Sequence, residues 1–300
     1  MQPEKIATLA GHQDCIYALA SAHDNRYFFS ADGEGKIAQW DLARPELGSL
    51  VAKVPNAVYA LCALPTNDEL LVGENFAGLH QINYTQKTET RSLHLTHSYI
   101  FDIQLQDNTA LVALGDGVIV YVDLEEWAVR KHIKASEKSA RCIAIHPDKQ
   151  TFAVGFSDNF IRIFDIKSGT LKHTLTGHKN SVFTLAYSPD GQYLLSGSRD
   201  AHLHIWEASH AYALKQSIAA HLFAINRLAY SPDGALFATG SMDKAVKIWD
   251  AKTFRLLKVL DKARHAGHGN SVNTLLWTPY ENYLLSAGDD RMVGVWQITL

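Results

Sequence analysis

Short apolar segments alternate with turn-forming clusters along most of this chain. Residues 203–206 and 246–249 each place three apolar side chains within four positions, which is typical of short β-strands. The cluster Ser-Pro-Asp-Gly stands before them at residues 188–191 and 231–234. Proline fixes φ and glycine permits a positive φ, so these clusters predict tight turns between strands.

One position of the predicted third strands recurs at intervals of 40 to 47 residues. It is occupied in turn by Trp40, Ile82, Val122, Phe164, Trp206, Trp249 and Trp296. The residue that follows it is acidic or carries an amide in every case: Asp41, Asn83, Asp123, Asp165, Glu207, Asp250 and Gln297. A period of this length indicates seven repeats of one supersecondary unit.

The best-preserved repeat begins with Gly177-His178 and ends with Trp206-Glu207. The next repeat has His221 near its start and ends with Trp249-Asp250. With these signatures the chain resembles a WD40 repeat protein over nearly its whole length. The resemblance implies an all-β fold, a seven-bladed β-propeller with four strands per blade, and a single domain over residues 1–300.

The two ends of the chain complement each other in this arrangement. Residues 5–9 have the pattern of an outer strand and precede the first Gly-His, whereas the seventh repeat stops after its third strand. We therefore expect residues 5–9 to pair with the last blade and close the ring, which protects an exposed sheet edge. The longest interval contains residues 261–269, which we interpret as an enlarged loop.

Composition and charge restrict the function classes. The formal net charge is −3 and no basic tract stands out, which argues against direct nucleic-acid binding. No P-loop, GxGxxG or HExxH motif occurs, so we expect no cofactor and no metal. The start of the chain lacks an apolar signal segment, and no run approaches about 18 apolar residues. We expect a cytoplasmic protein without membrane contact, or a nuclear one in a eukaryote.

Cysteine and histidine offer two further chemical alternatives. Cys15, Cys62 and Cys142 fall on the predicted first strands of three repeats, which favours reduced packing residues over a disulfide framework. A reactive thiol is the alternative. Histidine pairs at 202/204 and 265/268 have spacings that a metal could use, although zinc sites usually add cysteine or carboxylate ligands.

A His/Ser/Asp/Trp set recurs in the fifth and sixth repeats. Its members are His178, Ser198, Asp200 and Trp206, and then His221, Ser241, Asp243 and Trp249. The resemblance implies that these groups form hydrogen bonds within a blade. A hydrolytic Ser/His/Asp site is the alternative, but it needs an exposed nucleophile. The first repeat has Glu34 at the aspartate position, and the seventh has Gly288 at the serine position.

One position of each predicted first strand lies between two apolar anchors. Its seven occupants are Tyr17, Tyr59, Phe101, Arg141, Phe183, Asn226 and Asn273. Flanking apolar residues are three positions apart, as in Ile16 and Leu19, which breaks the period of two of a strand. A β-bulge would reconcile the spacing and turn the bulged side chain away from the sheet. The resemblance places this position near the mouth of the central channel, on the face of the Gly-His loops.

Two hypotheses from different classes follow. The first is a non-enzymatic scaffold that binds a peptide segment or partner subunit at the channel mouth, as a monomeric propeller within a larger complex. Arg199, Met242 and Asp289 precede the turn aspartate positions and would form its rim. The second is a propeller hydrolase or lyase, although the seven positions hold no carboxylate and no histidine. Recognition of a modified lysine or arginine would be a form of the first hypothesis.

Overall fold

The computed structural model describes residues 2–65 and 67–299, so Met1 and Leu300, the ends of the predicted domain, lie outside the described residues, as does Thr66. The described chain forms two compact units. The first unit combines Met1–His97 with Ala229–Leu300, and the second is Ser98–Leu228. Each unit is described by itself below, and the expectation of a single domain stays a prediction.

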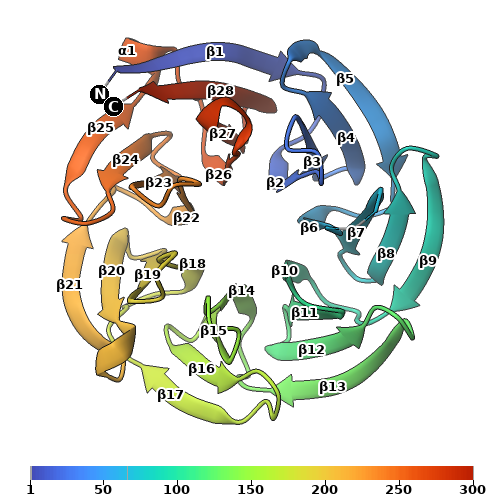
Figure 1. The fold of residues 1–300 in the computed structure, drawn as a ribbon, viewed down its shortest axis with the longest axis vertical. Helices are drawn as coiled ribbons and strands as arrows, with labels where there is room; N and C mark the ends of the chain where they lie inside the picture. Colours follow the sequence, from blue (N-terminus) through green and yellow to red (C-terminus); the bar gives the residue numbers. More distant parts are fainter. Residues whose placement is uncertain (1, 66, 300) are drawn as a thin grey trace. The chain divides into compact units, whose positions relative to one another are not determined.

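The first unit contains three complete sheets and most of a fourth. The sheet at the chain ends has the order β1-β28-β27-β26, and the others run in sequence order (Figure 1). Its strands are β1 (Gln2–Ala10), β2 (Ile16–Ser21), β3 (Tyr27–Asp32), β4 (Lys36–Asp41), β5 (Arg44–Lys53), β6 (Val58–Ala63), β7 (Glu69–Glu74), β8 (Gly78–Asn83), β9 (Thr88–His94), β23 (Leu236–Ser241), β24 (Val246–Asp250), β25 (Leu256–Leu260), β26 (Val272–Trp277), β27 (Tyr283–Gly288) and β28 (Met292–Thr299).

The second unit contains three sheets, each an antiparallel meander in sequence order. Its strands are β10 (Ile100–Gln106), β11 (Thr109–Leu114), β12 (Val118–Asp123), β13 (Ala128–Lys134), β14 (Ala140–Ile145), β15 (Thr151–Phe156), β16 (Ile161–Asp165), β17 (Leu171–Leu175), β18 (Val182–Tyr187), β19 (Tyr193–Ser198), β20 (His202–Glu207) and β21 (Ala213–Ala219). The strand β22 (Ile225–Tyr230) begins in this unit and opens the sheet β22-β23-β24-β25.

Seven four-stranded antiparallel sheets are the blades of a seven-bladed β-propeller, so the predicted fold class is confirmed. All seven aligned positions, from Trp40 to Trp296, lie on the third strand of a blade in chain order. The register of the repeats was therefore predicted correctly. The reason is that a buried aromatic or aliphatic side chain at this position is needed in every blade, including those that have lost tryptophan.

The N-terminal strand joins the last blade, as predicted. Strand β1 pairs antiparallel with β28 from Gln2 opposite Thr299 to Ala10 opposite Met292, with a register shift between Lys5 and Ala7. Figure 1 shows the two strands side by side, with both chain ends at the same end of the pair. Leu9 is buried in this sheet. The ammonium of Lys5 lies 5.2 Å from the ring centroid of Trp296 and donates a hydrogen bond to the Ala266 carbonyl.

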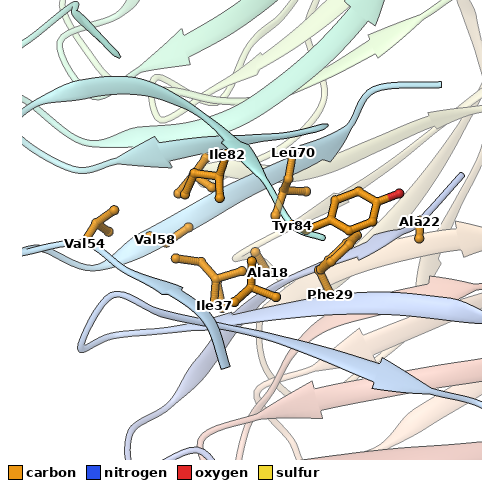
Figure 2. Packing of buried hydrophobic residues seen from close by; sticks show 12 residues of the cluster. Ala18, Ala22, Phe29, Ile37, Val54, Val58, Leu70, Ile82 and Tyr84 are labelled. Carbon is orange, nitrogen blue, oxygen red and sulfur yellow. The ribbon is translucent and has the colours of Figure 1, made fainter. Parts of the chain in front are cut away.

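Apolar clusters join neighbouring blades within each unit. In the first unit, Phe29 and Ile37 of one blade face Leu70 and Ile82 of the next, and all four are at most 2% exposed (Figure 2). In the second unit, a comparable cluster joins β14–β17 to β18–β20. These interfaces are made by apolar residues that alternate along the inner strands, because successive side chains of a strand point to opposite faces.

The predicted turns and the enlarged loop are both present. Gly191 and Gly234 have φ of 72° and 71°, and the N–H of Gly191 donates to the Ser188 carbonyl at 2.8 Å. The enlarged loop contains a single helical turn, α1 (Lys262–His265). The Asp261 carboxylate caps it by accepting the Arg264 N–H at 2.8 Å. Two short 3₁₀ helices, η1 (Ala208–His210) and η2 (Tyr280–Asn282), complete the described elements.

Candidate partner-binding site

A β-bulge on the first strand re-aims one side chain in six blades. Register shifts between the two flanking residues place these bulges at Tyr17, Tyr59, Phe101, Arg141, Phe183 and Asn273. All six side chains are half-buried, whereas the apolar residue before each is fully buried. The bulge inferred from the three-residue spacing is thus confirmed in these blades. Asn226 occupies the same second position of β22 and is half-buried too.

In the first unit, the bulged residues are two tyrosines in contact and an asparagine that binds an aspartate. The rings of Tyr17 and Tyr59 meet edge to face with centroids 4.7 Å apart. Burial raises the pKa of Tyr17 above its ordinary value, and neighbouring Cys15 and Tyr59 add to the shift, so the hydroxyl stays protonated at neutral pH. The Asn273 amide donates to the Asp289 carboxylate at 2.7 Å and to the Ile16 carbonyl at 3.2 Å. This last bond ties the seventh blade to the first.

In the second unit, the bulged residues are an arginine and two phenylalanines, and the guanidinium of the arginine stacks on both phenyl rings. The guanidinium carbon of Arg141 lies 3.8 Å from the ring centroid of Phe101 and 4.7 Å from that of Phe183. Tyr99 stacks on Phe101 with centroids 5.4 Å apart and an interplanar angle of 19°. Arginine keeps its charge at any physiological pH, and aromatic faces attract a cation. The three neighbouring first strands therefore hold one fixed positive charge between two phenyl rings.

The three predicted rim residues lie in turns between second and third strands. Arg199 and Met242 are exposed, and Met242 is 56% accessible. Asp289 is half-buried because its carboxylate accepts the Asn273 amide. Asp289 is thus linked directly to a bulged residue.

Four exposed apolar residues at the same ends of the blades in the second unit were not predicted from the sequence. Tyr99, Phe160, Leu222 and Phe223 are 41%, 36%, 83% and 58% exposed. A signal was present for Leu222-Phe223, because two polar residues follow the loop histidine in the first and fifth repeats, Gln13-Asp14 and Lys179-Asn180. Exposed apolar side chains that gather in loops mark interaction surfaces.

The network of the fifth blade differs from the predicted one in its serine. The imidazole of His178 contacts Asp200 through Nδ1 at 3.1 Å and Ser196 through Nε2 at 2.8 Å. The indole N–H of Trp206 donates to the same Ser196 hydroxyl at 2.8 Å. Ser198, the predicted member, donates instead to the Asn180 carbonyl and accepts the Asp200 N–H. The correct link is therefore Ser196, two residues earlier on the same face of β19.

The same correction applies to the first and seventh blades. In the first, His12 contacts Asp32 at 2.7 Å and Ser30 at 2.6 Å, and Trp40 donates to Ser30 at 2.8 Å. Asp32 thus replaces the aspartate expected at Glu34, whose side chain pairs with Lys36. In the seventh blade, His268, Asp290, Ser286 and Trp296 form the complete network. Gly288 does not interrupt the network of this blade, because the serine that links the histidine and the tryptophan is Ser286.

The sixth blade uses a threonine at the linking position. The Trp249 indole donates to the Thr239 hydroxyl at 2.9 Å. Ser241 accepts the Asp243 N–H at 3.0 Å and so belongs to the turn. Asp243 in turn accepts the Ala245 N–H at 3.1 Å, and His221 is buried. A buried hydroxyl ten residues before the tryptophan is the feature that these four blades share.

The described residues show neither a group of three or more metal-ligating side chains nor a helix long and apolar enough to cross a membrane. Cys15, Cys62 and Cys142 form no disulfide, and Cys142 is buried. Burial raises the pKa of the Cys15 thiol, and the nearby Asp289 carboxylate raises it further. A thiol of this kind is protonated at neutral pH and is a weak nucleophile.

The blades and their buried networks define a β-propeller of the repeat-blade class, and the family comparison agrees. The model described as WD domain, G-beta repeat, matches residues 3–41, 169–207, 213–250 and 257–297, which together cover just over half of the chain. The model of the anaphase-promoting complex subunit 4 WD40 domain matches residues 125–183. The chain therefore belongs to the WD40 family.

Curated relatives are similar at low identity. The chain is 24% identical to Protein groucho of Drosophila melanogaster over 216 residues, which are 68% of the chain and 29% of groucho. It is 23% identical to a Striatin homolog of Dictyostelium discoideum over 67% of the chain and 21% of that protein. It is 24% identical to Striatin-4 of Homo sapiens over 66% of the chain and 22% of that protein. The chain thus spans less than a third of each of these relatives.

Proposed function

We propose that this chain is a non-enzymatic scaffold that binds a peptide segment or a partner subunit through the bulged residues of its first strands. The observation that carries the proposal is the repeated bulge, which turns one side chain away from the sheet at the same strand position in six blades. Four of these side chains are aromatic. Rigid aromatic side chains bury a large area at low entropic cost, which suits them as binding anchors.

The buried networks support a structural role for the Ser/His/Asp sets. The Ser196 and Ser286 side chains are fully buried, and each already binds an imidazole and an indole. A serine nucleophile must instead be reachable by substrate beside an oxyanion hole. Proteins of the WD40 family are mostly interaction platforms, and this proposal extends that property to the first-strand residues of this chain. We also propose that the protein acts in the cytoplasm as a subunit of a larger complex.

The test begins by identifying a partner through affinity capture from the native cell and mass spectrometry. Binding of the purified partner is then measured by calorimetry for wild type, Phe183→Ala and Tyr59→Ala. Each substitution should weaken binding by about 1–3 kcal/mol, the usual range for an anchor, and leave the circular dichroism spectrum native.

Tyr193→Ala is the matched control, because it truncates an aromatic residue at the opposite end of the fifth blade. Its affinity should equal that of wild type. Loss of binding in Tyr193→Ala and in variants of the turns at residues 188–191 and 231–234, with Phe183→Ala and Tyr59→Ala unaffected, would move the binding surface to the other face and refute the proposal.

A further inference from the structure

Four flat side chains from three consecutive blades form one stack in the second unit. They come from the first strands β10, β14 and β18 and from the loop before β10, and they are Tyr99, Phe101, Arg141 and Phe183. Tyr99 lies nearly parallel to Phe101, with centroids 5.4 Å apart. The guanidinium carbon of Arg141 lies 3.8 Å from the ring centroid of Phe101 and 4.7 Å from that of Phe183. Arg141 is therefore the member that links the two phenylalanine anchors.

The strands that carry this stack are tied together independently of it. The buried carboxylate of Asp102 on β10 accepts the Ile143 N–H of β14 at 2.8 Å. The buried thiol of Cys142 on β14 donates to the carbonyl of Val182, the first residue of β18, at 3.8 Å. Both strands that bear a phenylalanine anchor are thus held beside β14. The freedom that remains at the bulges is rotation of the side chains.

Rotation of a side chain weakens its use as an anchor. Phe101 and Phe183 are only half-buried, so the sheet alone does not fix the orientation of either ring. A side chain that becomes ordered only when a partner binds loses entropy in that step, and affinity falls accordingly. A guanidinium is planar, and aromatic faces attract it. Because Arg141 contacts both rings, it limits their rotation before a partner arrives.

The first unit shows an arrangement that does not need such a link. Tyr17 and Tyr59 lie on the first strands of consecutive blades and meet each other directly, with centroids 4.7 Å apart. In the second unit a whole blade separates the two phenylalanines, because Phe101 belongs to β10 and Phe183 to β18. The first strand of the blade between them, β14, carries Arg141 at its bulge.

We propose that Arg141 is a positioning residue, which acts through Phe101 and Phe183 and keeps both rings oriented for a partner by the flat shape of its guanidinium. This inference rests on the proposed function and adds how the anchors of the second unit are prepared for binding. A flat uncharged side chain should therefore replace Arg141, whereas a flexible charged one should not. An aromatic ring suits this position, because four of the other bulges carry one.

Peptides selected on the wild-type protein provide the probe while the natural partner is unidentified. A random dodecapeptide library displayed on phage is selected on the full-length protein, and peptides whose affinity falls in Phe183→Ala are kept. Calorimetry then measures their affinities for Arg141→Lys, Arg141→Met and Arg141→Tyr. The lysine and methionine variants should bind at least about fivefold more weakly, as expected when two side chains must be ordered on binding. Arg141→Tyr should bind within about twofold of wild type.

A second measurement distinguishes positioning from direct contact with the peptide. Nuclear magnetic resonance relaxation of ring-labelled phenylalanine should show more motion of the Phe101 and Phe183 rings in unbound Arg141→Lys and Arg141→Met than in wild type and Arg141→Tyr. Ser196→Ala is the matched control for stability, because it disturbs the buried network of the blade that carries Phe183 and leaves the stack intact. It should bind the peptides like wild type.

The outcomes separate the two proposals. Wild-type affinity in Arg141→Lys or Arg141→Met would show that the flat guanidinium is not needed. Weak binding by Arg141→Tyr, or weaker binding without more ring motion, would mean that Arg141 itself contacts the peptide. An equal loss in Ser196→Ala would reduce the effect to stability, and peptides that depend on Tyr59 but not on Phe183 would leave Arg141 without a role.

Each of these results overturns the positioning role alone. A selection that yields no peptide dependent on Phe183 or Tyr59 would instead overturn the proposed function, and this inference with it.

Discussion

His204 is the residue whose surroundings differ most from those of an ordinary histidine. Its ring stacks face to face on that of His178, with centroids 3.9 Å apart and planes 7° from parallel. It is 3% exposed, and its Nδ1 has no hydrogen-bond partner. Burial lowers its pKa to about 4, and the neighbouring His178 contributes to the shift. A protonated imidazole is therefore poorly tolerated at this place in the folded protein.

This arrangement predicts acid sensitivity in a defined window. The ordinary pKa of histidine is 6.5 and that of folded His204 about 4, so between these values the unfolded chain binds more protons. Stability should fall as the pH drops through this window, by on the order of 1 kcal/mol between about pH 7 and about pH 5. Urea titrations of wild type and His204→Phe should show this loss in wild type only.

The exposed His210 provides the control, and His210→Asn should retain the wild-type pH dependence. A second loss is expected at lower pH. Burial opposes ionisation of Asp200, but hydrogen bonds from His178 and the Lys179 N–H outweigh it and hold the pKa of Asp200 well below its ordinary 3.8. The stability that Asp200 contributes is present above that ordinary value and is lost below it. If His204→Phe lost stability between pH 7 and 5 as wild type does, the loss would come from protonation of another residue.

Ser196 should matter more for stability than its size suggests. Its hydroxyl binds both the His178 imidazole and the Trp206 indole in a fully buried place. Ser196→Ala leaves these two groups without their shared partner, which should cost about 1–3 kcal/mol. The exposed Ser209 is the control, and Ser209→Ala should change stability by less than about 0.5 kcal/mol. Equal denaturation midpoints for Ser196→Ala and wild type would show that the link contributes nothing.

The histidine and tryptophan of these networks could be found from the sequence, but the serine could not. Ser196 and Ser198 are two residues apart on β19, so their side chains point to the same face. A repeat pattern cannot decide which of the two meets the indole. The same limit explains why Glu34 was aligned with the aspartate position although Asp32 binds His12. That bond depends on the geometry of the turn, which the repeat pattern does not reveal.

At the scale of elements, the bulges were predictable because they disturb a simple period. Apolar residues three apart on a strand cannot both face the core without one extra residue, and the pairing of β2 with β3 shows that residue at Tyr17. The composition of the cluster around each bulge was not predictable. The stacking of Arg141 between Phe101 and Phe183 joins three separate blades, and no local pattern encodes it.

Strand β1 should be essential to the stability of its unit. Removal of residues 2–10 exposes the edge of β28, and the loss of buried Leu9 alone should cost about 1.5–3 kcal/mol. We expect a lower unfolding temperature and a greater tendency to aggregate, because an unpaired edge invites other strands. Differential scanning calorimetry and light scattering measure both.

A synthetic peptide of residues 2–10 provides the control for this truncation. Added in excess, it should restore the unfolding temperature, because it can pair with β28 in the native register. A scrambled peptide of the same composition should not. An unfolding temperature that is unchanged by the truncation would show that the pairing contributes no stability.

At the scale of the whole molecule, we propose that the chain unfolds as one domain despite its two compact units. The boundary between Leu228 and Ala229 falls inside the continuous strand β22. If the two units unfolded separately, β22 would have to be divided between a folded and an unfolded part. We therefore expect one calorimetric transition in which the calorimetric and van't Hoff enthalpies agree. Two resolved transitions, or a stable proteolytic fragment that ends near residue 228, would assign two domains instead.

The pairing of β1 with β28 also determines how the chain responds to tension. Gln2 lies opposite Thr299, so both ends of the chain leave the blade at the same end of one antiparallel pair. A force that pulls the termini apart loads the hydrogen bonds at that end first and breaks the following ones in turn. Strands pulled from opposite ends would instead load all their hydrogen bonds together, in shear. If polypeptide handles were attached at both termini and pulled, β1 should separate from β28 at low force. Single-molecule stretching would record this as an early, small extension before the blades unfold.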